Sequence, residues 1–299
     1  MKRRDFLKLS GAAAMTWGLG RADWAHAAQP DLAVVQGPTR EAVRKAVELM
    51  GGMKRFVKPG HRVVIKPNMS FPSSAEQGAN TTPQAVSELA RLCWQAGAAK
   101  VLVLDNPLGP AERCLDKSGI LEACQAVKRG MVHMVESPDL YEKVSVPKAQ
   151  AVPRIQVMKE VLKADVLIAA PTAKSHSGAG VSLSMKGMMG LVRDRGTFHS
   201  SGLAAGIVDL VSVVKAQLTV IDATRVLTSG GPHGPGKLIA AKTIIASTDM
   251  VAADAYSVAQ FEWYGRRYEP RQVPHIKLAH QRGLGRMDFE NLKVSKVVL

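Results

Sequence analysis

The residues best suited to chemistry gather in one stretch of the chain, between residues 171 and 199. Lys174 and His176 stand among small residues, and Lys186 and His199 follow them. Amines, imidazoles and loop N–H groups can together bind an anion. His176 and His199 are candidates for an acid, a base or a metal ligand, and Lys174 for a group that binds a carboxylate or phosphate. Solvated loop residues without a function would give the same pattern.

Further polar residues follow other predicted strands. Lys66 and Asn68 end the strand that begins at Arg62, and Asp222 follows a strand predicted from Leu218 to Ile221. Asn68 could equally form a turn. Because loops at the carboxyl ends of parallel strands converge at one edge of a sheet, we expect these side chains to face a common crevice.

Four further residues complete the candidate ligand-binding set. Gly230 and Gly231 open a Gly/Pro loop that resembles a phosphate cradle, but Leu238 follows its lysine where a Walker loop has a hydroxyl residue. Thr82 is also a predicted helix N-cap, and Asp254 lies on a predicted helix. No G-x-G-x-x-G opens a helix after the first strand, so a dinucleotide site is not supported.

The sequence leaves a cofactor open. His176 and His199 could hold a divalent metal together with Asp222, with some analogy to nickel-dependent racemases. No iron–sulfur cluster of its own is expected, because the three cysteines show no C-x-x-C spacing. At most one pair of them could form a disulfide, and buried inert thiols are the simpler expectation.

The pattern of elements predicts an α/β fold with a mostly parallel sheet flanked by helices. Short β-branched runs alternate with helical segments, which is typical of parallel βαβ units. Residues 138–153 contain three prolines and predict an excursion or the seam between two lobes. We predict a helix from Gln156 to Lys163, a strand over Val166–Ala169, and then a long loop that carries Lys174 and His176. Any ligand crevice is expected at the carboxyl ends of the strands.

The amino-acid composition limits the classes of protein to which this chain can belong. With 299 residues and 46% hydrophobic residues, the chain can form one or two domains. The net charge of +15 is compatible with nucleic acid, an anionic membrane surface, acidic small ligands, or a basic surface without a specific partner. Nucleic acid ranks last, because the basic residues are scattered and aromatics make up 5%. No apolar run reaches membrane-spanning length, so no stable membrane anchor is expected.

Residues 1–27 resemble a twin-arginine signal peptide. Arg3 and Arg4 precede Phe6-Leu7-Lys8, an apolar stretch and a small-x-small site ending at Ala27. The resemblance implies that the twin-arginine translocase exports the chain to the periplasm, leaving an α/β domain over residues 28–299. The alternative is a basic amphipathic helix of the fold.

The order of motifs resembles that of the domain-of-unknown-function 362 family. The matching stretches are Val64-Ile65-Lys66-Pro67-Asn68, Thr81-Thr82-Pro83, Gly97-Ala98, Ala164-Asp165, Lys174-Ser175-His176, Lys186 with Gly190, His199, Asp222-Ala223, Gly230-Gly231-Pro232 and Ala253-Asp254-Ala255. They cover residues 31–298. Gly187 stands where relatives usually have asparagine. Some members of this family are joined to ferredoxin-like iron–sulfur modules. The resemblance therefore implies an association with redox proteins, and a redox protein is a candidate partner of this chain.

Three functional hypotheses follow. In the first, the chain is an enzyme that binds an anionic small molecule at the Lys/His site and performs acid–base or redox-linked chemistry on it. In the second, it is a non-catalytic accessory or ligand-binding partner of a periplasmic iron–sulfur oxidoreductase. The third is an α/β protein without activity, since a fold alone implies no function.

Overall fold

A computed structural model describes residues 29–299, and the predicted signal peptide lies outside this part. The main sheet has the strand order β15-β1-β12-β10-β7-β2-β3-β4. Neighbours along it are parallel except at β12, which is antiparallel to both β10 and β1. The mostly parallel α/β sheet predicted from the sequence is therefore confirmed. The strands are β1 (Leu32–Gln36), β2 (Arg62–Pro67), β3 (Lys100–Asp105), β4 (Val132–Met134), β7 (Val166–Ala170), β10 (Leu218–Leu227), β12 (Thr243–Ser247) and β15 (Val294–Val298).

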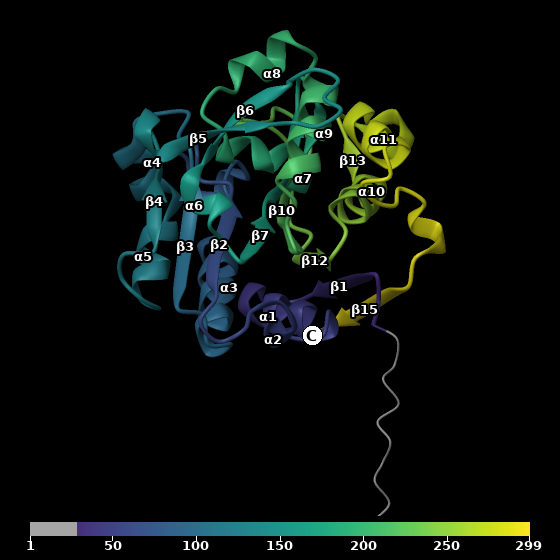
Figure 1. The fold of residues 1–299 in the computed structure, drawn as a ribbon. Helices are drawn as coiled ribbons and strands as arrows, with labels where there is room; N and C mark the ends of the chain where they lie inside the picture. The colour runs from purple at the N-terminus through teal and green to yellow at the C-terminus, as the bar shows by residue number, and fades with distance from the viewer. Residues whose placement is uncertain (1–28) are drawn as a thin grey trace, which may run out of the picture.

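Helices cover both faces of this sheet (Figure 1). On one face pack α1 (Thr39–Leu49), α2 (Met53–Phe56), α3 (Pro83–Gln95) and α5 (Ile120–Gln125), with α4 (Ala111–Ser118) beside α5. On the other pack α6 (Lys159–Leu162), α7 (Ser184–Gly187), α9 (Leu203–Val213), α10 (Met250–Gln260) and α11 (Pro274–Gln281). Successive side chains of a strand point to opposite faces of the sheet, so β2 contributes to both helical layers. Val63 and Ile65 belong to one hydrophobic cluster, and Val64 belongs to the other.

Helix boundaries follow local chemistry. Thr82 is the N-cap residue of α3 and Pro83 is its first residue, as predicted. The Asp249 side chain accepts from the N–H groups of Val251 and Ala252 and so caps α10. Gly119 has a φ of 67°, which ends α4 before α5 begins.

The helix predicted from Gln156 to Lys163 is confirmed only over Lys159–Leu162, which form α6, because the residues before it belong to a strand. Residues Arg154–Met158 form strand β6, which pairs with β5 (Tyr141–Ser145) as an antiparallel hairpin. Ile155 and Val157 are buried while Arg154 is exposed, which is a period of two. The proline-containing excursion thus holds a hairpin, and its apolar side chains belong to the same cluster as α9 and α10.

The long loop predicted after β7 is also wrong. Thr172–His176 form strand β8, which pairs with β10 and with β9 (Gly180–Ser182). This pairing is possible because β10 continues to Leu227 instead of ending at Ile221. All five residues of β8 are buried although four of them carry polar or charged side chains, so hydrophobic periodicity could not reveal the strand.

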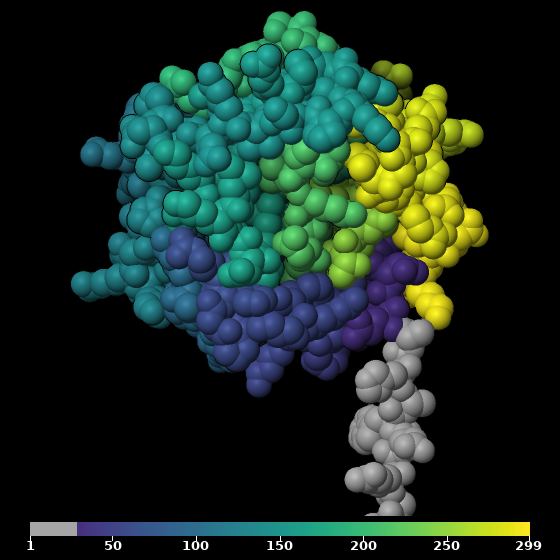
Figure 2. Space-filling model, viewed as in Figure 1, coloured from purple at the N-terminus to yellow at the C-terminus, as the bar shows by residue number. Residues whose placement is uncertain are grey.

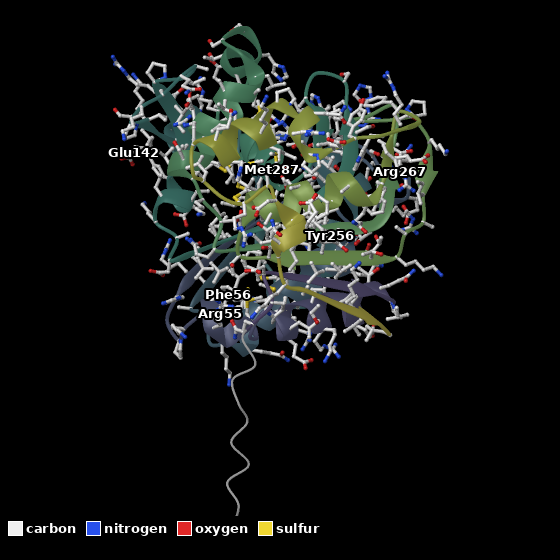
Figure 3. All side chains as sticks on the ribbon, turned by 90° about the vertical axis from the view of Figure 1, so that its right-hand side faces the viewer. Arg55, Phe56, Glu142, Tyr256, Arg267 and Met287 are labelled. Atoms are coloured by element: carbon white, nitrogen blue, oxygen red, sulfur yellow. The ribbon has the colours of Figure 1, made fainter. Side chains whose placement is uncertain are left out.

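Smaller elements complete the described chain. They are α8 (Gly196–Ser200), β11 (Leu238–Ile239), and the hairpin of β13 (Glu262–Trp263) with β14 (Arg266–Arg267). In the space-filling view, residues around 150–200 form the top of the molecule and the C-terminal segment, in yellow, forms its upper right side (Figure 2). In Figure 3, Tyr256 of α10 and Met287 mark the side where the C-terminal segment packs, and the Tyr256 ring meets Phe289 edge-on at 6.0 Å.

Two features bear on the expectations about membrane and disulfides. Within residues 29–299, none of the helices combines the length and the apolar character that crossing a membrane requires. Cys93, Cys114 and Cys124 are all buried and free. Burial raises the pKa of the Cys124 thiol to about 12, as expected for an inert core thiol.

Candidate functional site

The candidate site lies where the strand order reverses. The chain passes from β2 to β3 on one side, whereas β7 pairs with β2 on the other side. In open α/β sheets, ligands bind in the crevice beyond the carboxyl ends of the strands at such a point. A cavity of about 550 Å³ opens there. It is lined by Lys66, Asn68, Ser70, Phe71, Asp105, Leu108, Lys174, His176, Ser177, Ser182, Lys186, Gly187, Met189, Gly190, Arg195, Gly196, His199, Pro232 and His233.

The structure brings together six of the predicted site residues. Lys66 and Asn68 come from the end of β2, and Lys174 and His176 from β8. Lys186 comes from α7 and His199 from α8. The convergence of strand ends expected from the sequence is therefore observed for this set. Lys174 and His176 reach the cavity as neighbours on one face of a strand, because they stand two positions apart.

Positive charge dominates the lining. Lys66, Lys174, Lys186 and Arg195 contribute cations, and Asp105 is the acidic residue among the lining residues. The Lys66 Nζ lies 3.1 Å from the Asp105 Oδ1, and both side chains are buried. This one carboxylate pairs with Lys66, which leaves the other three cations available to an anion.

The Asp105 carboxylate has its hydrogen-bonding capacity filled by the protein. Its Oδ2 accepts from the Met69 N–H at 3.0 Å, and its Oδ1 accepts from the Asn106 N–H at 2.9 Å. With Lys66 as its third partner, the carboxylate is fixed at the end of β3. Asp105 therefore anchors the cavity wall and orients Lys66.

Lys174 is buried without a carboxylate partner among the residues that the structure describes. Its Nζ donates to the Ala79 carbonyl and lies 4.9 Å from the centroid of the Phe71 ring. Burial, with the nearby Lys186 charge as the next cause, lowers the pKa of the Lys174 ammonium to about 7. At neutral pH a large fraction of this side chain is therefore a free amine.

Lys186 and Arg195 also line the cavity. Burial lowers the pKa of Lys186 to about 8, assisted by the charges of Arg195 and Lys66. The guanidinium of Arg195 donates to the carbonyl oxygens of Asn106 at 3.1 Å and Pro107 at 2.8 Å, which orients it. An incoming anion would relieve the repulsion among these cations.

His176 is set up as a neutral hydrogen-bond donor. Its Nδ1 accepts from the N–H groups of Gly178 at 3.1 Å and Ala179 at 3.2 Å, so the neutral ring carries its hydrogen on Nε2. Burial, then the charges of Lys186 and Lys174, lower the pKa of His176 to about 3. The His199 ring stacks at 6.4 Å, and burial lowers its pKa as well. Near neutrality, Lys174 is thus better suited than His176 to exchange a proton.

Asn68 links two walls of the cavity. Its Oδ1 accepts from the Thr172 N–H at 3.0 Å, and its own N–H donates to the Thr81 Oγ1 at 2.9 Å. The carboxamide oxygen is used in tying β2 to β8. The amide NH₂ is the end that a ligand could meet.

Asp222 does not join the site. Because β10 extends through it, Asp222 lies within a strand, where its carboxylate accepts from the Thr82 N–H at 2.7 Å and the Thr224 N–H at 3.0 Å. Asp222 therefore fixes the start of α3, and neither it nor Thr82 lines the cavity. The proposed metal set of His176, His199 and Asp222 is not assembled. Across residues 29–299, no group of three or more His, Cys, Asp or Glu side chains is placed to hold a metal ion.

Asp254 lies behind the site instead of in it. Its buried carboxylate accepts from the Ser184 N–H at 2.8 Å, the Ser184 Oγ at 2.6 Å and the Met185 N–H at 3.0 Å. Burial raises its pKa to about 7. Asp254 thereby fixes the first turn of α7, the helix that carries Lys186.

The loop that begins with Gly230 and Gly231 lines the cavity through the two residues that follow these glycines. Gly230 and Gly231 are not among the lining residues, whereas Pro232 and His233 are. The Gly231 N–H donates to the Ser175 Oγ at 3.0 Å, and a side chain at Gly231 would overlap the Ser175 carbonyl. Gly231 therefore allows close packing on β8, whereas Gly230 packs against the Pro235 carbonyl of its own loop, and neither lines the cavity.

Sequence reasoning missed Arg195, Phe71 and the structural role of Asp105 in this site. Arg195 precedes His199 in a segment that was predicted to be loop, where an arginine looks like any solvated residue. Asp105 at the end of β3 was visible as a polar residue after a strand. Its pairing with Lys66 depends on the neighbouring order of β2 and β3, which the sequence does not state.

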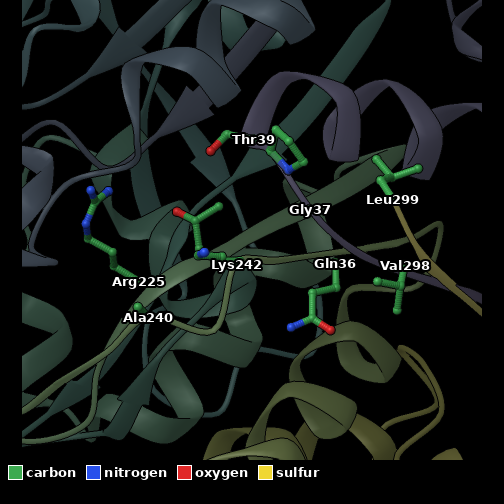
Figure 4. A pocket seen from close by; sticks show the side chains of 10 residues that line it. Gln36, Gly37, Thr39, Arg225, Ala240, Lys242, Val298 and Leu299 are labelled. Carbon is green, nitrogen blue, oxygen red and sulfur yellow. The ribbon is translucent and has the colours of Figure 1, made fainter.

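A second cavity, of about 570 Å³, lies near β1 and β15 (Figure 4). Its side-chain cations are Arg225 and Lys242. Arg225 is half-buried and Lys242 is exposed, so water screens their charge. It therefore has no counterpart of the fully buried Lys66 and Lys174 of the first cavity.

Comparisons with known proteins identify a family and a relative of this chain. A family described as domain of unknown function 362 (DUF362) matches residues 63–259. The thylakoid-associated protein sll1697 of Synechocystis sp. is 27% identical over 267 residues, covering 83% of this chain and 76% of that protein.

Two solved structures of α/β proteins are similar in fold. The lactate racemase apoprotein of Thermoanaerobacterium thermosaccharolyticum matches with a TM-score of 0.45 and 15% identity over 74% of this chain, which spans 55% of that protein. A Thermotoga maritima protein matches with a TM-score of 0.46 and 13% identity over 82% of this chain, which spans 60% of that protein.

Proposed function

This chain belongs to the DUF362 family, and for this member we propose that the cavity beside β2 and β8 binds an anionic small molecule and supports acid–base chemistry on it. One observation carries the proposal. Lys174, Lys186 and Arg195 face one cavity whose single lining carboxylate is already paired with Lys66. Lys174 is buried, and Lys186 and Arg195 are partly buried. Cations withdrawn from water without counter-charges are costly, and a carboxylate or phosphate ligand would offset that cost.

We assign residues of the cavity different roles in the proposed function. Lys186 and Arg195 bind the anionic group, and the Asn68 NH₂ and the His176 Nε2–H donate hydrogen bonds to polar atoms of the ligand. Lys174, with its pKa lowered to about 7, exchanges the proton. A group whose pKa lies near the operating pH is the most effective acid–base catalyst.

A binding experiment tests this proposal. Sulfate and lactate should raise the melting temperature of the full-length protein and give saturable binding by calorimetry. Lys186→Gln should weaken both affinities at least roughly tenfold, since a hydrogen bond to a charged group contributes about 1.5–3 kcal/mol. Lys242→Gln in the second cavity is the matched control and should leave them unchanged. Equal weakening by both variants would show that only the general basic charge attracts anions.

The same experiment separates the enzyme from the accessory role. If neither anion binds, the proposal fails, and a ligand-independent accessory partner of a periplasmic iron–sulfur oxidoreductase becomes the better hypothesis. Co-purification from the native cell tests that alternative, because it requires a stoichiometric redox partner.

We also propose that the twin-arginine translocase exports the chain to the periplasm. The support is the order of Arg3-Arg4, the apolar stretch and Ala25-His26-Ala27. Replacing both arginines by lysine keeps the charge and should retain the protein in the cytoplasm, which fractionation would detect. Unchanged periplasmic recovery of the double variant would contradict export by this route.

A further inference from the structure

Lys174 is placed as a nucleophile. Its Nζ lies against an aromatic ring and a backbone carbonyl, in a cavity that also holds Lys66 and Lys186. The neighbouring charges come from three elements, with Lys66 on β2, Asp105 on β3 and Lys186 on α7. Asp105 is paired with Lys66, so no carboxylate among the described residues pairs with the Lys174 amine. Desolvation beside a second cation is the environment that leaves a lysine as a free, reactive amine.

A hydrogen-bond donor lies on the same face of the same strand. His176 stands two positions after Lys174 on β8, and its Nδ1 is occupied by two backbone N–H groups. The neutral ring therefore directs its Nε2–H away from that turn. A donor of this kind can polarise the carbonyl oxygen that an adjacent amine attacks.

From this juxtaposition we infer that Lys174 forms a Schiff base with the carbonyl group of a small 2-oxo carboxylate. The inference rests on the proposed function, because Lys186 and Arg195 bind the carboxylate that stands next to the reacting carbonyl. In the step, the Nζ lone pair attacks the carbonyl carbon and a C–N bond forms. The carbonyl oxygen takes up a proton, the C–O bond then breaks, and the oxygen leaves as water. Both hydrogens of that water come from the neutral amine, so amine and ketone give imine and water.

Reductive trapping with pyruvate tests the inference. Full-length protein is incubated with pyruvate and cyanoborohydride, and the products are measured by intact mass and peptide mapping. We expect one adduct per chain at low pyruvate concentration, located on Lys174 and suppressed by excess lactate. Lys174→Met should abolish this adduct, and Lys242→Gln should retain it. A melting curve of Lys174→Met shows that the variant is folded.

A second readout does not depend on any variant. An imine of pyruvate makes the methyl hydrogens acidic, so the wild-type protein should exchange them with deuterium from solvent faster than free amines do, as NMR would record. Adducts spread over exposed lysines, equal in wild type and in Lys174→Met, would overturn the inference. Saturable pyruvate and lactate binding without an adduct on Lys174 would also overturn it, while the proposed anion site would stand. Absence of binding by both anions would overturn both.

Discussion

At the scale of single residues, the cavity depends on a close approach at Gly190. A Cβ built there would overlap the Asp105 carboxylate and the end of the Lys66 side chain, and would lie 2.7 Å from the Lys66 Nζ. Gly190 also accepts from the Asn106 N–H at 3.0 Å through its carbonyl. The glycine therefore lets the buried Lys66–Asp105 pair form against the backbone.

Gly190→Ala should lower the free energy of unfolding by about 3 kcal/mol, because the buried ion pair must separate to admit the methyl group. Denaturant unfolding measures this change. Gly187→Ala is the matched control, since its Cβ would meet the Pro171 Cβ at an ordinary 3.6 Å. We expect the control to change stability by less than about 1 kcal/mol. Equal losses in the two variants would show that the pair at Lys66 and Asp105 is not what Gly190 protects.

Residue types were readable from the sequence, but their partners were not. Lysine and histidine near strand ends predicted an anion site, and Lys66, Lys174, His176, Lys186 and His199 do share a cavity. Asp222 and Asp254 looked equally suitable as polar residues. Both carboxylates are used by backbone N–H groups, at the starts of α3 and α7. A sequence shows that a carboxylate exists and does not show which unsatisfied N–H groups it will meet.

At the scale of elements, the short helix α7 determines where Lys186 points. A helix of four residues is too short to be stable by itself, so its position depends on contacts with the rest of the protein. Asp254 on α10 supplies them by accepting from the first N–H groups of α7. The two helices act as one unit in holding a cation at the cavity.

Asp254→Asn should lower the free energy of unfolding by about 2 kcal/mol, because the amide replaces an acceptor with donors that face N–H groups. It should also weaken sulfate binding several-fold at temperatures well below the melting point, although Asp254 does not line the cavity. Calorimetry and denaturant unfolding measure the two effects. Asp249→Asn removes a carboxylate from the cap of α10 and should leave sulfate affinity unchanged. A variant at Asp254 that loses stability but keeps full affinity would refute its positioning of Lys186.

The sequence predicted strands correctly where the buried residues are also the hydrophobic ones. Strands β2 and β7 consist largely of apolar residues, and both lie where the sequence pattern indicates. The prediction missed strand β8, because its polar residues are buried by the pairing with β10 and by facing the cavity. Such exceptions are expected at functional sites, where side chains serve a ligand at the expense of the local pattern.

At the scale of the whole molecule, buried lysines couple stability to pH. The pKa of Lys174 is about 7 and that of Lys186 about 8 in the folded protein, against 10.5 as the ordinary value. Between these values the unfolded chain binds more protons than the folded one. The free energy of unfolding therefore rises with pH across this window.

Urea unfolding at pH 7 and pH 9 should show this rise in the wild type. Lys174→Met should be more stable than the wild type at pH 7 and should show a smaller rise between the two pH values, since it removes one of the two groups. The exposed Lys143→Met serves as the control and should follow the wild type. A pH dependence identical in all three proteins would mean that the folded Lys174 titrates at an ordinary pKa.

The pairing of β1 with β15 has a consequence for biosynthesis. Val34 and Lys296 are register partners, and Asp31 hydrogen-bonds through its carboxylate to the N–H of Lys293. Among the described strands, β1 leaves the ribosome first and β15 last. One edge of β1 therefore stays uncovered until β15 has been synthesised. The sheet stays incomplete until residues 294–298 have been synthesised, so a ribosome stalled before residue 294 would display β1 as an open edge.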